Sequence, residues 1–466
     1  MRIILIGAGK IGYQIAGKLA QEAYNVVVID RDLEVVNRIG ETLDVLAVQA
    51  NGLLKHPLEE LGVNQDDIVI AATASDEGNM IACLSAKNLG AGKTIARIRN
   101  PEFTKDLAVS KEDVAVDYVI NPEKSTANDI TQLLTFSPAG QLGDFAGKKV
   151  QMVQLPVEEK GLLDGMAVWQ FGEMTRVLVA AVSRNGRIII PRGDDILRAG
   201  DDIFVTGKRD EITDFCVKLG LNATRPRNVM IIGGGRISHY LAENLHHHGV
   251  NVKIIESDPK NCRTLSELLP HALVILGDGT DAELLKAENI ASMDAVVALT
   301  GRDEDNILVS LLAKQLGAGK GVAKVSRANY ISLAEMIGVD AVVTPSIITA
   351  GEILRLIRGE RVMSLFLLLG GQAEINEFLV KPDDPVVNKT LKEIELPKEV
   401  LVVAVVRGPK LITPRGDTTI QAGDRAIVIF KADAAAKVKT LFGSLERKRT
   451  YGLWSRLKSI GSIAGS

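Results

Sequence analysis

Two glycine-rich segments of the chain have the residue types and the spacing that hold nucleotide phosphates. In the first, Gly7, Gly9 and Gly12 form a G-x-G-x-x-G sequence after an apolar run, and Asp30 follows the last glycine by 18 residues. Gly7 would allow the tight turn, Gly9 the close approach of a phosphate, and Gly12 the packing of a helix on a strand. The N–H groups that begin this helix attract an anion. Asp30 would accept hydrogen bonds from ribose hydroxyls and repel a 2′-phosphate, which favours NAD over NADP.

The second segment repeats this pattern with one exchange. Gly233 and Gly235 supply the first two glycines, Ser238 stands in place of the third, and Glu256 takes the place of the aspartate. Serine is small, so the packing of helix on strand should survive, and the carboxylate is kept. The segment therefore predicts either a second nucleotide site or a vestigial pocket.

Polar residues at the ends of further predicted strands extend both sites. After the third strand of the second segment, Asp278 either accepts from the amino group of an adenine or caps a turn. The first segment has Asn51 there, whose oxygen accepts without a charge. Thr73 and Thr300 end the fourth strands, where they either contact ribose or phosphate or start the next helix through the aspartate three residues later.

Basic residues follow the fifth predicted strands: Arg97 and Arg99 in the first segment, Lys324 and Arg327 in the second. A cation at this place either meets the terminal phosphates of a nucleotide or is a solvated surface charge. If ATP and ADP act differently, the added phosphate must find a cation in one state of the protein only. We expect Arg97, together with Arg99, in that role, and an unchanged ATP affinity of an Arg97→Ala protein would exclude it.

Residues for catalysis or metal binding do not stand out. A hydride-transfer enzyme needs an acid or base opposite its nucleotide, and neither segment has a His or Lys placed for that task. The histidine cluster His246, His247 and His248 ends a predicted helix and has no Cys or acidic partner spaced for tetrahedral ligation. We therefore expect no catalytic residue and no metal site, and an NAD-dependent dehydrogenase is the alternative.

The sequence elements around these residues occur twice. Gly7 and Gly233 are 226 residues apart, as are Asp30 and Glu256, and the sequence Pro-Arg-Gly-Asp at 191–194 returns 223 residues later. The chain is therefore a tandem duplication of a unit that is too long for one small domain. In each unit, a βα-rich part precedes a part with short strands and Gly-Asp turns.

The pattern of the first unit alternates strands and helices, which predicts a parallel, doubly wound sheet. Strands are expected at 3–6, 26–29, 45–48, 68–72 and 94–98, and helices from Lys10 and at 33–39, 53–61 and 79–89. Helices expected at 122–136 and 345–358 would link the two parts of each unit. The predicted class is α/β, with two tandem Rossmann-like doubly wound parallel-sheet domains, each followed by a small α+β domain. The expected boundaries are 1–135, 136–224, 225–358 and 359–446, before a basic tail at 447–466.

Composition excludes several classes of protein. The 466 residues carry 55 Lys and Arg against 58 Asp and Glu, so overall charge does not favour nucleic acid. Three widely separated cysteines form no disulfide framework and fit a reducing cytosol. No apolar run reaches the ~18 residues of a membrane span. The tail at 447–466 has five basic and no acidic residues, so it either docks on a membrane or transporter surface or is disordered.

The ordered combination of these features resembles a known family. Two glycine loops with acidic partners, each followed by an Asp-Glu segment, a linking helix and the Pro-Arg-Gly-Asp module, are similar to the TrkA family. These are regulatory subunits of Trk-type potassium uptake systems and carry two regulator-of-potassium-conductance (RCK) units. The resemblance covers residues 1 to about 446. It implies a non-enzymatic protein at the cytoplasmic face of the inner membrane that gates a TrkH- or TrkG-like integral-membrane potassium-translocating subunit.

The resemblance also implies a homotetrameric ring whose shape responds to NAD or NADH and to ATP or ADP, with C-terminal lobes, called TrkA-C domains, that dimerise. A sensor for another cation transporter is a further alternative. Asn51 and Ser238 depart from the Asp and Gly that the family favours. The implied nucleotide contacts are Gly7, Gly9, Lys10, Ile11, Gly12, Asp30, Asn51, Thr73 and Arg97 in the first unit and Gly233, Gly235, Arg236, Ile237, Ser238, Glu256, Asp278 and Thr300 in the second.

Overall fold

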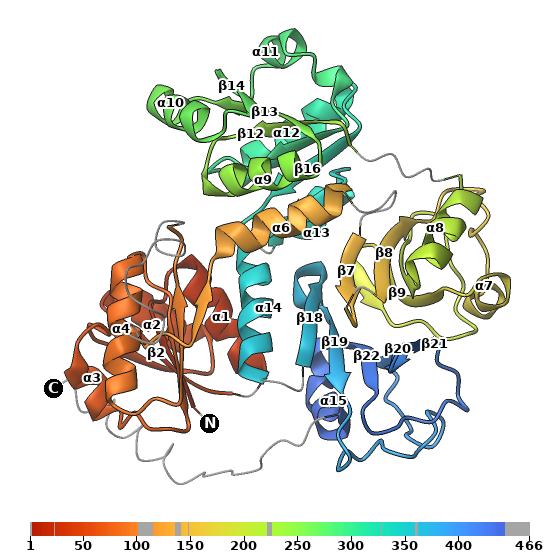
Figure 1. Cartoon of the computed structure of the whole chain (residues 1–466), viewed down its shortest axis with the longest axis horizontal. Helices are drawn as coiled ribbons and strands as arrows, with labels where there is room; N and C mark the ends of the chain where they lie inside the picture. Colours follow the sequence, from red (N-terminus) through yellow and green to blue (C-terminus); the bar gives the residue numbers. More distant parts are fainter. Residues whose placement is uncertain are drawn as a thin grey trace. The chain divides into compact units, whose positions relative to one another are not determined.

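The computed structural model describes residues 2–22, 24–100, 115–135, 141–147, 149–220, 226–327, 329–358 and 362–442. Strands and helices alternate in the N-terminal part (Figure 1), because short buried apolar runs are separated by amphipathic stretches. The elements are β1 (Arg2–Ile6), α1 (Lys10–Gln21), β2 (Asn25–Asp30), α2 (Leu33–Thr42), β3 (Leu46–Gln49), α3 (Lys55–Glu60), β4 (Asp67–Ala71), α4 (Asp76–Asn88), β5 (Lys93–Arg97), β6 (Tyr118–Ile120) and α6 (Pro122–Thr135).

The second half of the chain repeats this order from residue 228. Its elements are β12 (Asn228–Ile232), α9 (Arg236–His247), β13 (Asn251–Glu256), α10 (Pro259–Leu268), β14 (Ala272–Leu276), α11 (Ala282–Ala287), η1 (Ile290–Ser292), β15 (Ala295–Ala298), α12 (Asp303–Gln315), β16 (Lys320–Lys324), α13 (Asn329–Met336), β17 (Ala341–Val343) and α14 (Pro345–Arg358).

The two parallel sheets have the same strand order. The first runs β3-β2-β1-β4-β5-β6 and the second β14-β13-β12-β15-β16-β17, with every pair parallel. This confirms the predicted pair of Rossmann-like, doubly wound domains. The order reverses between β1 and β4, and between β12 and β15, so the loops after β1 and β12 lie at the switch points where such sheets bind ligands.

Two smaller antiparallel sheets complete the fold and confirm the predicted α+β domains. Their strand orders, β10-β9-β11-β8-β7 and β18-β19-β22-β20-β21, are equivalent in the two repeats. The elements are β7 (Gln141–Phe145), β8 (Val150–Pro156), α7 (Val168–Met174), β9 (Leu178–Arg184), β10 (Arg187–Ile189), β11 (Asp202–Gly207) and α8 (Arg209–Lys218), and then β18 (Val362–Leu368), η3 (Leu369–Gly371), β19 (Ala373–Leu379), β20 (Val400–Arg407), β21 (Lys410–Ile412), β22 (Arg425–Lys431), η4 (Ala432–Ala434) and α15 (Ala435–Phe442).

The duplicated Gly-Asp module is an ion-pair clasp in each small domain. The carboxylate of Asp201 is 2% exposed and accepts from both Nε and Nη2 of Arg184, each at 2.7 Å. Asp424 is fully buried and accepts from Arg407 in the same bidentate way at 2.8 Å. Each carboxylate also accepts a backbone N–H of its own turn, at 2.9 Å and 2.8 Å. The clasps therefore tie the turn before β11 and β22 to strands β9 and β20.

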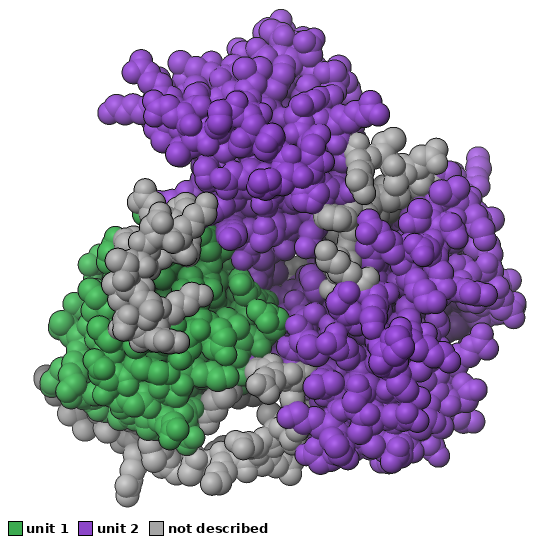
Figure 2. All heavy atoms as spheres, in the orientation of Figure 1, with its two compact units in different colours: residues 1–122, 349–357, 445–466 green, residues 123–348, 358–444 purple. Residues whose placement is uncertain are grey.

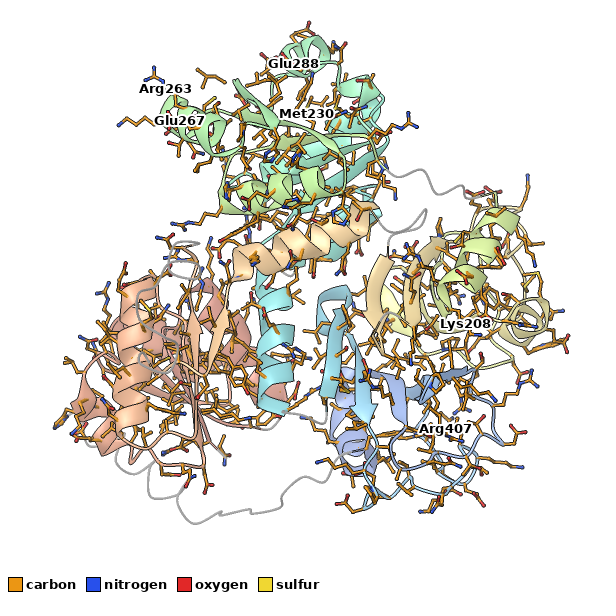
Figure 3. All side chains as sticks on the ribbon, in the orientation of Figure 1. Lys208, Met230, Arg263, Glu267, Glu288 and Arg407 are labelled. Atoms are coloured by element: carbon orange, nitrogen blue, oxygen red, sulfur yellow. The ribbon has the colours of Figure 1, made fainter. Side chains whose placement is uncertain are left out.

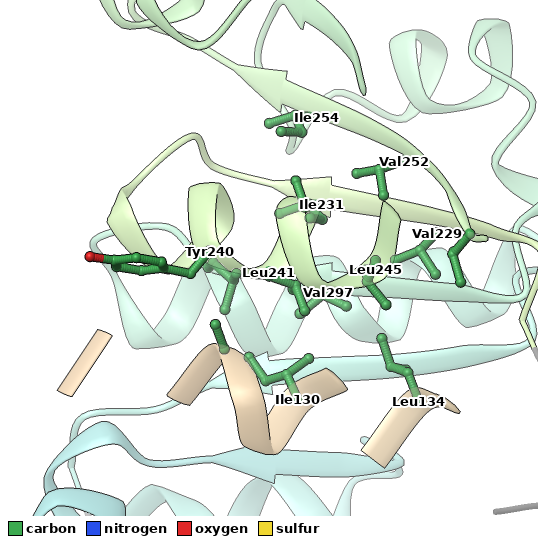
Figure 4. Packing of buried hydrophobic residues seen from close by; sticks show 14 of the residues in the cluster. Ile130, Leu134, Val229, Ile231, Tyr240, Leu241, Leu245, Val252, Ile254 and Val297 are labelled. Carbon is green, nitrogen blue, oxygen red and sulfur yellow. The ribbon is translucent and has the colours of Figure 1, made fainter. Parts of the chain in front are cut away.

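Most of each linking helix groups with the Rossmann domain of the other repeat. Contact density places the described residues of 1–122 and 349–357 in one compact unit, and those of 123–348 and 358–442 in a second (Figure 2). In the second unit, Ile130 and Leu134 of α6 join one core with Leu241 and Leu245 of α9 (Figure 4). The first unit holds most of α14, so the two repeats exchange their linking helices.

The two small domains share a core inside the second unit. Phe145, Met152 and Phe204 from the first small domain belong to the same buried cluster as Ile375 and Ile429 from the second. Phe145 and Phe366 pack edge to face with ring centroids 5.0 Å apart. The small domains therefore behave as one packed pair within a single chain.

Across the described part of the chain, no helix is long and apolar enough to cross a membrane. The basic segment at 447–466, expected to dock or to be disordered, lies outside the described residues.

Candidate nucleotide-binding sites

The first glycine loop joins β1 to α1, and the structure requires or favours glycine at its three positions for different steric reasons. Gly7 has φ +96°, and a Cβ on it would lie 2.8 Å from the backbone nitrogen of Thr73. A Cβ on Gly12 would lie 2.0 Å from the carbonyl oxygen of Gly7, so this glycine protects the loop itself more than the contact of helix and strand. A Cβ on Gly9 would meet nothing within 4 Å. Open space at Gly9 is what the approach of a phosphate requires.

Asp30, at the end of β2, fixes the backbone of this loop by a hydrogen bond. Its Oδ2 accepts from the backbone N–H of Ala8 at 2.7 Å, and its Oδ1 accepts from the backbone N–H of Asp32 at 3.0 Å. A carboxylate offers about four acceptor positions, so two remain for a ligand. Those positions suit the two hydroxyls of a ribose.

The start of α1 completes the phosphate side of the site. Lys10 and Ile11 are the first two residues of α1, with Gly9 as the residue before the helix. No acidic residue stands in the first turn of α1, and Lys10 is exposed there. The same holds for Arg236 and Ile237, which begin α9 after Gly235. Free N–H groups and a nearby cation at a helix start attract phosphate.

Thr73 is tied to the strand ends by a buried asparagine that the sequence interpretation did not single out. The Oδ1 of Asn79 accepts from the N–H of Thr73 at 2.8 Å and from its hydroxyl at 2.6 Å, and the Nδ2 of Asn79 donates to the carbonyl oxygen of Arg97 at 2.7 Å. Asn79 is fully buried in α4. One amide thus brings the ends of β4 and β5 together beside the glycine loop.

One of the two expectations for this segment was that Asp76 caps α4, and the structure shows that it does not. The cap is Ser75, whose Oγ accepts from the N–H of Gly78 at 3.0 Å. The carboxylate of Asp76 instead accepts from the backbone N–H groups of Arg99 and Asn100, at 2.9 Å and 2.8 Å, and from the Arg99 side chain. Asp76 therefore fixes the backbone that leaves β5, and Arg97 and Arg99 lie together at that end of the sheet.

Asn51 follows β3, where the backbone N–H of Ala50 donates to the carbonyl oxygen of Asp30 at 2.9 Å. Its Oδ1 accepts from the N–H of Leu53 at 3.2 Å. In the second repeat, Oδ1 of Asp278 accepts from the N–H and the hydroxyl of Thr280 at 2.9 Å and 2.7 Å. These two bonds, led by the backbone one, hold the pKa of Asp278 below its ordinary value. Both side chains therefore form Asx turns. The turn of Asn51 follows the residue that bonds to Asp30 of β2, and the turn of Asp278 follows the residue that bonds to Glu256 of β13.

The second glycine loop keeps the backbone shape of the first. Gly233 has φ +96°, as Gly7 does, and a Cβ on Gly235 would meet nothing within 4 Å. Ser238 is fully buried, and its hydroxyl donates to the carbonyl oxygen of Gly233. The second loop therefore accommodates a Cβ at the third position, and the serine hydroxyl bonds to the carbonyl oxygen that faces it.

The carboxylate of Glu256 is more fully engaged than that of Asp30. It accepts from the backbone N–H groups of Gly234 and Asp258, at 2.6 Å and 2.7 Å. It also accepts from Nδ2 of Asn261 at 2.9 Å and from the hydroxyl of Ser257 at 3.4 Å. Neither Asn261 nor Ser257 was singled out from the sequence, because no motif marks them.

The strand ends of the second repeat follow the same design with one addition. The buried Asn306 binds Thr300 and the carbonyl oxygen of Lys324 as its counterpart does in the first repeat. Burial would raise the pKa of Asp303, but the N–H of Ser326 and the side chain of Arg327 outweigh it, and the pKa is lowered. The guanidinium of Arg327 also binds Glu304 and lies 4.2 Å over the ring of Tyr330.

The described residues offer no group of three His, Cys, Asp or Glu side chains placed for a metal ion. His246 stacks on His271 with ring centroids 4.0 Å apart, and burial, aided by His246, lowers the pKa of His271. Both glycine loops present the start of a helix to a phosphate, and Asp30 beside the first loop keeps acceptor positions that suit a ribose.

Family models match most of the chain in two alternating pairs. The TrkA-N domain matches residues 3–122 and 229–345, and the TrkA-C domain matches residues 152–220 and 375–443. The glycine loops and their acidic partners lie inside the two TrkA-N matches, and the carboxylate–arginine clasps lie inside the two TrkA-C matches.

Curated relatives match over nearly their whole length. The chain is 37% identical over 450 residues to Trk system potassium uptake protein TrkA homolog 1 of Methanosarcina mazei, which covers 95% of this chain and 100% of the relative. It is 37% identical over 442 residues to the Archaeoglobus fulgidus homolog, with the same coverage. It is 33% identical to TrkA of Haemophilus influenzae, over 93% of this chain and 96% of the relative.

Solved structures agree on the fold. The GsuK RCK domain matches with a TM-score of 0.59 at 19% identity, covering 94% of both chains. The GsuK channel bound to NAD matches with a TM-score of 0.60 at 20% identity, covering 94% of this chain and 78% of that one. At such identity these matches show the fold alone.

Proposed function

This chain belongs to the TrkA family of Trk system potassium uptake proteins, and from that premise we propose that it is a nucleotide-binding regulatory subunit. It binds to an integral-membrane potassium-translocating subunit of the TrkH or TrkG type at the cytoplasmic face of the inner membrane. It changes the activity of that subunit in response to NAD or NADH and to ATP or ADP. It catalyses no reaction, and it works as a homotetramer.

The observation that carries the nucleotide part of this proposal is the geometry around Asp30. Its carboxylate supports the glycine loop through the N–H of Ala8 and keeps two acceptor positions for a ribose. The open space at Gly9 and the helix start at Lys10 stand next to it for the phosphate.

A route from this site to the rest of the chain supports regulation. Residues 349–357 of α14 belong to the same compact unit as the first Rossmann domain. Ala350, Ile353, Leu354 and Ile357 of this segment are buried. A nucleotide that changes the first Rossmann domain would therefore act on α14, and α14 leads directly to the second small domain in the sequence. A ligand shifts an equilibrium only through its different affinity for two states. Because this segment of α14 belongs to the unit that would bind the nucleotide, a change of state in that unit would include α14.

We expect an Asp30→Asn protein to bind adenine nucleotides about 10- to 100-fold more weakly, because it loses charge-assisted hydrogen bonds to the ribose. Isothermal titration calorimetry with ATP, ADP, NAD and NADH measures this. The matched control is Glu34→Gln, since Glu34 is an exposed carboxylate in the first turn of α2 and contacts neither the glycine loop nor Asp30. Equal affinities of the wild-type and Asp30→Asn proteins would show that the nucleotide does not use this carboxylate.

A further inference from the structure

The two glycine loops differ in how much of the acidic residue behind them is left for a ligand. Among the described residues, Asp30 accepts two hydrogen bonds, both from backbone N–H groups. Glu256 accepts the two equivalent backbone bonds and two more from side chains, of which the shorter comes from Asn261 at 2.9 Å. Because a carboxylate offers about four acceptor positions, Glu256 is saturated from within the protein.

Asn261 stands where the first repeat has Val35. The correspondence is structural, because the backbone N–H groups of both residues face the aspartate that caps their helix, Asp258 or Asp32. A valine side chain has no donor, so the first site cannot satisfy its own carboxylate in this way. The shorter of the two additional bonds to Glu256 therefore comes from a single exchange in the second helix, Val35 to Asn261.

Asn261 also holds the glycine loop of the second site. Its Nδ2 donates to the carbonyl oxygen of Gly234 at 2.9 Å, in addition to the bond with Glu256. A Cβ on Gly234 would lie 2.4 Å from Leu265, 2.6 Å from Glu256 and 3.1 Å from Asn261. The first loop has Ala8 at the position of Gly234, so it has room for a methyl group. In the second loop, Asn261 and Leu265 of α10 and the carboxylate of Glu256 fill that space.

The face of α10 that carries Asn261 and Leu265 is turned toward the loop. Leu265 is buried, whereas Arg263 and Glu267 project outward from α10 (Figure 3) and are exposed. Asn261 is thus fixed by the packing of its helix and is not a surface side chain that swings freely.

We propose that the side chain of Asn261 blocks the second site. Its amide takes the position on Glu256 that a ribose hydroxyl would take. This inference rests on the proposed nucleotide-binding function and makes it more specific. Each chain then binds one adenosine nucleotide, at the first Rossmann domain, and the second Rossmann domain is held closed by its own side chain. Arg327 binds Asp303, as Arg99 binds Asp76 in the first site, and it is held in addition by Glu304.

The test is the number of nucleotides bound per full-length chain, measured by equilibrium dialysis with radiolabelled ADP and ATP. We expect one equivalent for the wild-type protein and two for Asn261→Val, because removal of the internal donor raises the affinity of the second site about 10- to 100-fold. Thr264→Val is the matched control, since Thr264 is exposed on the same helix and its hydroxyl bonds only to the backbone of Lys260. It should stay at one equivalent.

The reciprocal variant protects the test against a folding defect of Asn261→Val. Val35→Asn introduces the same donor into the first site, and it should weaken binding there about tenfold or more. Two equivalents for the wild-type protein, one of them lost in Glu256→Gln, would overturn the blocking of the second site while leaving the proposed function intact. One unchanged equivalent in both Asn261→Val and Val35→Asn would also overturn it. No binding by the wild-type protein would reject the proposed function itself.

Discussion

Replacing Asp201 by alanine is expected to destabilise the first small domain by about 3 kcal/mol. Breaking one partner of a buried ion pair costs about 3–5 kcal/mol, and the lower end applies because 27% of the Arg184 side chain is exposed. The loss also removes the acceptor of the Arg198 N–H in the turn before β11. The Gly-Asp module is therefore a stabilising clasp, and its recurrence in both small domains follows from that role.

Urea unfolding followed by tryptophan fluorescence measures this effect. Trp169 lies in α7 of the first small domain, where its backbone N–H donates to the carbonyl oxygen of Gly193 at 3.0 Å. The other tryptophan, Trp454, is replaced by Phe in all proteins. Asp194→Ala is the control from the same module, since Asp194 is exposed, and it should change stability by less than about 0.5 kcal/mol. An Asp201→Ala protein as stable as this control would contradict the clasp.

Replacing Gly12 by alanine is expected to abolish nucleotide binding at the first site and to destabilise its domain by about 1–3 kcal/mol. The added Cβ would lie 2.0 Å from the carbonyl oxygen of Gly7, and backbone must move to relieve that contact. The moved segment includes the N–H groups at the start of α1 that we propose bind the phosphate. The loss of two such bonds weakens binding by more than about 100-fold.

Gly9→Ala separates binding from stability in this loop. Gly9 has φ −60° and ψ −170°, which alanine adopts, and no atom lies within 4 Å of the added Cβ. We expect a stability loss below about 1 kcal/mol together with weaker nucleotide binding, because the methyl group stands where the phosphate approaches. Thermal unfolding and calorimetry of the two variants give both quantities. Full nucleotide affinity in Gly12→Ala would show that the ligand does not bind at this loop.

The sequence predicted much of the fold because the relevant signals are local and repeated. Buried apolar runs of strand length gave β1, β2 and β4 to within one or two residues, and the duplication carried the same order to the second half. The helices expected at 122–136 and 345–358 are present as Pro122–Thr135 and Pro345–Arg358. Their exchange between repeats could not be predicted, because it depends on tertiary packing and no local pattern of the sequence indicates it.

The sequence indicates those residues of the candidate sites that belong to a motif. It does not indicate those whose role depends on tertiary packing. The glycine loops, Asp30 and Glu256 follow from spacing alone. Asn79 and Asn306 lie in the Asp-Glu segments, but their role requires two strand ends that meet only in the folded sheet. Asn261 is similar, because an asparagine in the first turn of a helix gives no indication that it reaches Glu256.

The central claim is that nucleotide bound at the first Rossmann domain controls potassium transport. It is tested most directly by potassium flux into proteoliposomes that contain a Trk-type potassium-translocating subunit and this protein, with and without ATP, ADP, NAD or NADH. We expect at least one nucleotide to change the flux with the wild-type protein and with Glu34→Gln, and we expect no such change with Asp30→Asn, although that variant still binds to the transporter. A flux that is independent of every nucleotide with the wild-type protein, or one that responds equally with Asp30→Asn, would contradict this account.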